Sequence, residues 1–228
     1  MKNAKIVTAL LGVVLIASML LTACNDSQAP AASSSPASSA PASSTSAEAG
    51  KAERRTSADK KVVTLNGELK ALEGPVFITS VGQSADVSML DALMKKIGAE
   101  YTFNSSAKAV DMAGAKTVII ASGASSKGLG AAGISADDEK VRAREILQAC
   151  KDNNVTVIMA HLGGVSRRGK LSDEFSDMVM EYSNGIIMVE DGNDDGKFSD
   201  FAKEKNIPIT LVNTIADCMV PLKTMFAK

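Results

Sequence analysis

The sequence predicts an α/β fold, a single three-layer domain of the Rossmann-like or flavodoxin-like kind with a mainly parallel sheet of five or six strands. Three observations support this prediction. From residue 75 onward, short apolar runs alternate with amphipathic segments, as in repeated βα units. The apolar runs are rich in β-branched residues, which is typical of strands that are buried on both faces. The segments between them repeat apolar residues at helical spacing.

The elements follow from these two patterns in chain order. The expected strands are residues 75–80, 117–121, 155–160, 185–189 and 207–212, with 100–103 as a short edge strand. The expected helices are 89–97, 137–151, 171–182, 198–205 and 219–226. Spacing predicts these inward-facing side chains: Met89, Leu90, Leu93, Met94 and Ile97 in the first helix, and Val141, Ile146, Leu147 and Cys150 in the second. Right-handed crossovers between the strands would place helices on both faces of the sheet.

The first 24 residues have the pattern of a secretory signal peptide. Lys2 and Lys5 precede an apolar run that ends in the sequence Leu-Thr-Ala-Cys at residues 21–24. This ending resembles the lipobox of bacterial lipoproteins, in which the cysteine is diacylated and becomes the first residue of the mature chain. We therefore predict that Cys24 carries the lipid, palmitate included, and holds the protein at the extracytoplasmic face of the cell membrane. The alternative is an uncleaved membrane-spanning helix, for which the run is barely long enough.

Residues 25–61 are predicted to form a disordered tether. They are rich in Ala, Ser and Pro and have few large apolar side chains, so they cannot bury enough surface to offset the entropy of ordering. A chain of this length would reach roughly 30–35 Å. The basic residues near its end favour a solvated segment, with attraction to anionic lipid headgroups as the second interpretation. Residues 62–228 remain for one α/β domain.

Charge and cysteine content limit the partners. The chain has 25 Lys+Arg against 26 Asp+Glu, and from residue 62 onward acidic residues outnumber basic ones, which argues against a nucleic-acid partner bound by a broad basic face. Cys150 and Cys218 lie on or beside predicted helices. An extracytoplasmic location permits a disulfide between them, but two buried, unpaired thiols are favoured because cysteine is commonly buried as a small apolar residue.

Polar, glycine-rich loops follow the predicted strands, whereas the loops that lead into the strands have an ordinary helix-ending composition. In open parallel sheets, ligands bind where the carboxyl ends of the strands meet. We therefore expect the site at this edge of the sheet. The candidate ligand-binding residues are Gln83, Ser84, Ser125, Ser126, Lys127, His161, Gly163, Gly164, Arg167, Arg168 and Asn193.

The basic candidates indicate a small anionic ligand. Arg167 and Arg168 could contact a carboxylate or phosphate with their guanidinium groups, and Lys127 would add a charge from a neighbouring loop. Consecutive backbone N–H groups, with the hydroxyls of Ser125 and Ser126, could cradle the same anion. The alternatives are ion pairs of the two arginines with Asp173 and Glu174, and a flexible loop with a solvated lysine.

No cofactor or metal is predicted. Residues 128–133 (GLGAAG) match the dinucleotide pattern GxGxxG literally, but five loop residues, 123–127, precede them, and the next strand ends at His161 rather than at an acidic residue. His161 is the only histidine, too little for a closed metal site. Residues 191–196 (DGNDDG) resemble half of a calcium loop, but Ala202 stands where that loop needs glutamate. An acidic turn that caps the next helix is favoured.

Two other functions stay open. A hydrolase or transferase could use Ser84 or Ser126 as nucleophile and His161 as base, although no GxSxG elbow occurs. A protein-interaction domain of an envelope assembly would instead need an exposed apolar patch. We favour a binding protein that carries out no covalent chemistry. Because 167 residues form only one lobe, its ligand could be shared with a membrane protein partner or a second copy of the chain.

Three segments carry a family resemblance: ITSVGQSAD at 78–86, SSKGLGAAG at 125–133 and HLGGVSRRGKLSDEF at 161–175. Together they resemble a family of uncharacterised bacterial exported and lipoprotein domains with no assigned function, over essentially all of residues 74–228. The resemblance implies an α/β lipoprotein domain and adds no catalytic residue.

Overall fold

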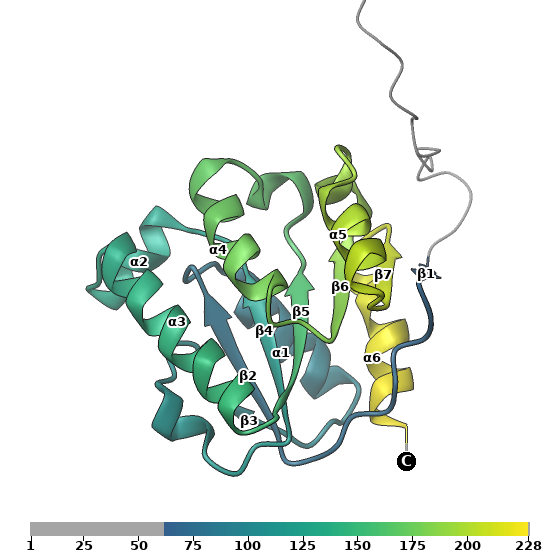
Figure 1. The fold of residues 1–228 in the computed structure, drawn as a ribbon, viewed down its shortest axis with the longest axis horizontal. Helices are drawn as coiled ribbons and strands as arrows, with labels where there is room; N and C mark the ends of the chain where they lie inside the picture. Colours follow the sequence, from purple (N-terminus) through teal and green to yellow (C-terminus); the bar gives the residue numbers. More distant parts are fainter. Residues whose placement is uncertain (1–61, 228) are drawn as a thin grey trace, which may run out of the picture. The chain divides into compact units, whose positions relative to one another are not determined.

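Seven strands form one sheet in the computed structural model, which describes residues 62–227 (Figure 1). The strands are β1 (Val62–Leu65), β2 (Val76–Val81), β3 (Thr102–Phe103), β4 (Thr117–Ser122), β5 (Thr156–His161), β6 (Gly185–Val189) and β7 (Ile209–Val212). Their order in the sheet is β1-β7-β6-β5-β4-β2-β3. All neighbouring strands are parallel except β1, which pairs antiparallel with β7.

The strand order is that of the flavodoxin type. From β2 the chain first moves outward to β3 and then crosses back to β4, so the order reverses between β2 and β4. This reversal is the topological switch point, next to which ligands bind in doubly wound sheets. The predicted α/β class and mainly parallel sheet are confirmed, with seven strands rather than five or six. The additional strand is β1, which lies before the region where the alternating pattern begins.

Helices cover both faces of the sheet and complete the three layers (Figure 1). The helices are α1 (Asp86–Lys96), α2 (Ser126–Ala132), α3 (Ala136–Asp152), α4 (Lys170–Met180), α5 (Lys197–Lys205) and α6 (Met219–Phe226). Side chains of α3, α4 and α5 pack on one face, and those of α1 and α6 on the other. Within β4, Val118 and Ile120 join the first cluster while Ile119 and Ala121 join the second, as the alternation of side chains along a strand requires.

Three details differ from the prediction. A short helix, α2, occupies residues 126–132, which were expected to be loop. Val141 is 52% exposed and Met89 is 40% exposed, although both were expected to face inward. In α3 the buried positions include Glu139 and Ala143 instead. The helix is turned this way because the Glu139 carboxylate binds a backbone N–H beyond the end of β2, as described below.

The two cysteines of the domain are buried and unpaired, as favoured above. Burial raises the pKa of the Cys150 thiol to about 11 and that of Cys218 to about 12. Both thiols are therefore protonated at neutral pH.

The predicted signal peptide, the predicted lipid attachment at Cys24 and the predicted tether of residues 25–61 lie outside the described residues. Within residues 62–227, no helix has the length and apolar character needed to cross a membrane.

Candidate functional site

A buried ion pair holds the loop that follows β2. Glu139 is fully buried and accepts a hydrogen bond from the Gly82 N–H (2.8 Å) and one from Nε of Arg142 (2.8 Å). Arg142 also donates to the backbone oxygens of Ser80 and Ala107. Sequence reasoning missed this pair, because an acidic and a basic residue three positions apart on a helix are usually both exposed.

Gln83 contacts the buried Glu139 and does not line an open anion-binding site. Its Nε2 lies 3.3 and 3.4 Å from the two Glu139 carboxylate oxygens, and its Oε1 accepts a hydrogen bond from Ser106 Oγ (3.1 Å). Its backbone adopts a positive φ of 55° and forms an isolated bridge with Ala124. Both ends of this candidate side chain therefore already have partners within the protein.

Backbone fills the crevice at the switch point between β2 and β4. The Gly123 N–H donates to the Val81 oxygen (3.1 Å), and the Ser125 N–H donates to the Gly82 oxygen (3.0 Å). A Cβ atom on Gly82 would clash with the backbone carbonyl of Gly123. These glycines allow two strand-exit loops to pack on one another, which is a different role from the expected binding of an anion by their N–H groups.

Arg167 lies over the closed crevice. Its aliphatic stem packs on Gly123 and Gly163, where an added Cβ would meet the stem. Its Nε donates to Oδ1 of the buried Asp86 (2.9 Å), and its side chain remains 23% exposed. Among residues 62–227, Arg167 Nη2 has no hydrogen-bond partner, and neither does the buried Asp86 Oδ2. The ion pair between Arg167 and Asp86 joins the loop after β5 to α1.

Arg168 instead serves the structure of the domain. Its guanidinium binds Asp173 (2.9 Å), Asp195 (2.7 Å) and the Gly192 backbone oxygen (2.6 Å), and it lies 5.3 Å from the centre of the Phe198 ring. Ion pairs of the two arginines with Asp173 and Glu174 were the alternative to an anion clamp, and the pair with Asp173 is confirmed for Arg168. Glu174 pairs with Lys140 instead (2.7 Å). The structure therefore does not bring Arg167 and Arg168 together as an anion clamp.

His161 is a core residue. Its side chain is fully buried, Nε2 lies 3.2 Å from the Arg167 backbone oxygen, and the ring centre lies 5.0 Å from that of Phe198. Burial lowers the pKa of the imidazole, so the ring is neutral at pH 7. Ser84 is also buried, and its Oγ accepts a long hydrogen bond (3.4 Å) from the Asp86 N–H. No hydrogen bond joins Ser84 or Ser126 to His161 in the described part of the chain.

The other candidates lie on the flanks of this edge. Ser125 caps α2 by accepting a hydrogen bond from the Gly128 N–H (3.0 Å), while Ser126 and Lys127 are exposed. Gly164 has a positive φ of 54°, and its backbone passes beside the Asp191 carboxylate.

The acidic loop after β6 forms a turn and a helix cap. Asn193 Oδ1 accepts hydrogen bonds from the N–H groups of Phe198 (2.9 Å) and Ser199 (3.2 Å) at the start of α5. Asp191 accepts one from the Val165 N–H (3.1 Å), and Asp195 pairs with Arg168. In the region that the structure describes, no three His, Cys, Asp or Glu side chains are arranged to hold a metal ion.

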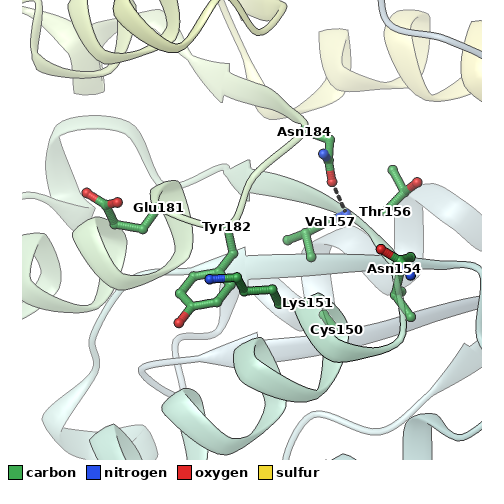
Figure 2. A pocket seen from close by; sticks show the side chains of 9 residues that line it. Cys150, Lys151, Asn154, Thr156, Val157, Glu181, Tyr182 and Asn184 are labelled. Atoms are coloured by element: carbon green, nitrogen blue, oxygen red, sulfur yellow. Dashed lines mark hydrogen bonds between the residues drawn. The ribbon is translucent and has the colours of Figure 1, made fainter.

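Hollows of substantial volume lie at the opposite, amino-terminal edge of the sheet. One of about 570 Å³ lies beside the start of β5, where α3 and α4 end (Figure 2). Another, of about 590 Å³, lies under residues 66–73 and extends to the starts of β4 and β5. Neither hollow was predicted from the sequence, because the loops at this edge have an ordinary composition.

The model of one protein family, described as a domain of unknown function (DUF6305), matches residues 73–226. This match confirms the resemblance to an uncharacterised family. No curated protein matches the chain.

Solved structures resemble the chain only distantly. They include a GDSL-like lipase from Bacteroides thetaiotaomicron (15% identity, TM-score 0.27, 59% of this chain and 65% of that one). A second is a lipolytic protein of the G-D-S-L family, described as putative, from Desulfitobacterium hafniense (14%, 0.29, 67% and 96%). A third is a GDP-L-fucose synthetase from Naegleria fowleri (12%, 0.33, 58% and 54%). The match thus spans just under two thirds of the first lipase, and TM-scores this low do not transfer an activity.

Proposed function

We propose that the chain, which belongs to the DUF6305 family, is a membrane-tethered extracytoplasmic lipoprotein that binds a small anionic ligand at the carboxyl edge of its sheet. The observation that carries the proposal is the position of the Arg167 guanidinium and its incomplete hydrogen bonding. Its guanidinium lies over the switch point, is held at Nε by the buried Asp86, and keeps Nη2 without a partner among the described residues. Lipid attachment at Cys24 rests on the sequence pattern alone.

The Asp86 contact suits Arg167 for binding. A carboxylate that engages Nε fixes the plane of the guanidinium, so less side-chain entropy is lost when a ligand binds. The terminal nitrogens can then form charge-assisted hydrogen bonds with a carboxylate or phosphate. The exposed Lys127 lies on α2, which follows the neighbouring β4, and would add longer-range attraction.

The same geometry favours binding over hydrolysis. A general base must reach the proton that it removes. The imidazole of His161 is fully buried, and Nε2 is directed at a backbone oxygen. Ser84, one of the two candidate nucleophiles, is buried as well, and neither Ser84 nor Ser126 is hydrogen-bonded to His161 in the described part of the chain.

Anion binding can be tested by calorimetric titration of the full chain with inorganic phosphate and with citrate. We expect Arg167→Gln to weaken binding by about tenfold or more, which corresponds to about 1.4 kcal/mol. The matched control is Arg144→Gln, which removes the same charge from an exposed position on α3. Equal losses in the two variants, or no binding of either anion to the wild type, would contradict the proposal.

A further inference from the structure

The hollow where α3 and α4 end, beside the start of β5, has the dimensions of a small-molecule site. Its volume of about 570 Å³ falls within the usual range for ligand pockets, roughly 300–1,000 Å³. It lies at the edge of the sheet opposite Arg167, between the ends of α3 and α4. The residues that line it are Cys150, Lys151, Asn154, Val155, Thr156, Val157, Glu181, Tyr182 and Asn184 (Figure 2).

Hydrogen bonds to the backbone hold this lining in place. The Asn184 N–H donates to the Val157 oxygen (2.8 Å), and the Val157 N–H donates to Asn184 Oδ1 (2.8 Å), the contact drawn in Figure 2. Asn154 has a positive φ of 52°, and its N–H donates to the Lys151 oxygen (3.2 Å). The pocket is thus formed before any ligand binds, which lowers the entropic cost of binding.

Polar groups around the pocket have unused hydrogen-bonding capacity. Within residues 62–227, the side chains of Lys151, Asn154, Thr156, Glu181 and Tyr182 form no hydrogen bond or ion pair. Both donors and acceptors are therefore available. An apolar ligand would remove these groups from water without offering partners, which is unfavourable.

The charges of the lining disfavour a ligand with a large net charge. Lys151 is the only cation of the lining and Glu181 the only anion, so the lining has no net charge. Because α3 and α4 both end here, the partial negative charge of two helix C-termini also disfavours an anion. The pocket therefore differs in chemistry from the Arg167 edge.

We infer that this pocket binds a neutral carbohydrate of one or two sugar rings, with Tyr182 as its aromatic contact. The Tyr182 ring is half-buried against the core and lines the pocket (Figure 2). A flat ring offers an apolar surface to the C–H face of a sugar, and the surrounding amides, carboxylate, ammonium and hydroxyls match sugar hydroxyls, which both donate and accept hydrogen bonds.

The test is saturation-transfer NMR followed by calorimetry on the full chain, in a detergent without a sugar headgroup. The probes are glucose, galactose, mannose and N-acetylglucosamine, and the β-1,4-linked disaccharides of glucose and of N-acetylglucosamine. Two variants remove pocket groups. Tyr182→Leu removes the ring, and Asn154→Gly removes an amide while permitting the positive φ. Arg167→Gln, at the other edge, is the control.

We expect at least one sugar to bind with a Kd of about 1 mM or tighter, both pocket variants to weaken it by about tenfold, and Arg167→Gln to leave it unchanged. If Tyr182→Leu fails to fold, Asn154→Gly decides, because Asn154 is exposed. Absence of binding for every probe, or binding that neither pocket variant weakens, would overturn the inference. Loss of phosphate binding with retention of sugar binding in Arg167→Gln would separate the two sites.

Discussion

Two adjacent arginines with the same side-chain chemistry have different environments. Arg168 is 16% exposed, binds two carboxylates and a backbone oxygen, and lies near the Phe198 ring, whereas Arg167 has one carboxylate partner and Nη2 without one in the described region. We predict that Arg168→Ala lowers the free energy of unfolding by roughly 1–3 kcal/mol, because it leaves partly buried acceptors without their donor. Denaturant titration measures this loss. A loss below that of the exposed Arg144→Ala would contradict the assignment.

The Arg168–Asp195 pair also predicts a pH dependence. The hydrogen bond from Arg168 lowers the pKa of Asp195 from 3.8 to about 2. Because the folded-state pKa lies below the unfolded one, the pair stabilises the fold fully above about pH 4 and progressively less as the pH falls towards 2. Asp195→Asn should therefore reduce the melting temperature at pH 6 and approach the wild type near pH 2. A difference that does not shrink with acid would show that the pair has no such role.

The thiols give a residue-scale prediction of their own. With pKa values of about 11 and about 12, Cys150 and Cys218 have very little thiolate, and both side chains are buried. We predict that neither reacts with a thiol reagent in the folded protein near pH 8, and that both react once denaturant unfolds it. Mass spectrometry counts the adducts. Rapid labelling of Cys150 alone would contradict this prediction and show that reagents reach Cys150 through the pocket that it lines.

At the scale of single residues, the sequence predicted some side-chain roles and not others. The pairing of Arg168 with Asp173 could be anticipated, because the two residues are close in the sequence and one lies in the first turn of a helix. The burial of Asp86 and Glu139 could not, since each is stabilised by an arginine or a backbone N–H contributed by a distant segment. Charged residues on helices are exposed in most cases, so composition gives no signal for such pairs.

Among the elements, those with a long, regular pattern were predicted well and those without one were missed. Strand β6 and helix α6 have the predicted bounds. For β6 the polar residues Ser183, Asn184 and Glu190 flank a short apolar run. Helix α2 contains Gly128 and Gly130, which disfavour a helix, and it forms through its Ser125 cap and its packing on the loop after β2. Strand β1 depends on pairing with β7, at the far end of the chain.

The two glycines of α2 provide a matched pair of substitutions. A Cβ atom on Gly128 would overlap the Gln83 backbone oxygen, whereas one on Gly130 would meet nothing within 4 Å. We predict that Gly128→Ala destabilises the domain by about 1–3 kcal/mol, because the helix must move away from the loop. Gly130→Ala should be neutral or stabilise by up to about 1 kcal/mol, because alanine favours the helix. Thermal unfolding compares the two, and equal effects would show that α2 does not pack as described.

For the whole molecule, topology predicted where a ligand should bind but not how the edge is filled. The flavodoxin-type order places the switch point between β2 and β4, as the general rule requires. The glycines that suggested an open cradle instead permit the two loops to pack closely. The large hollows lie at the amino edge, where they arise from the way helix ends and loops meet. Such packing gaps have no signature in one sequence.

The course of the chain relates the proposed anchor to the two edges. Val62, the first described residue, pairs with Val212 at the carboxyl end of β7, so the chain enters the domain at the edge where Arg167 lies. The pocket lined by Tyr182 opens at the opposite edge. The first described residue therefore lies at the edge of the proposed anion site, and the proposed sugar site lies at the other end of the strands.

The anchor itself can be tested with Cys24→Ser, expressed as the full chain. A thioether-linked lipid supplies roughly 0.8 kcal/mol of membrane affinity per buried CH₂, so the wild type should partition into the detergent phase on Triton X-114 separation, and the mature protein should begin at Cys24 with the mass of added acyl chains. The variant cannot be lipidated at this position. If the apolar run of residues 6–21 is instead an uncleaved membrane-spanning helix, both proteins will stay in the detergent phase and both will keep their first residues. That result would remove the lipid anchor from the proposal. The Arg167 site would still be tested by its own titration.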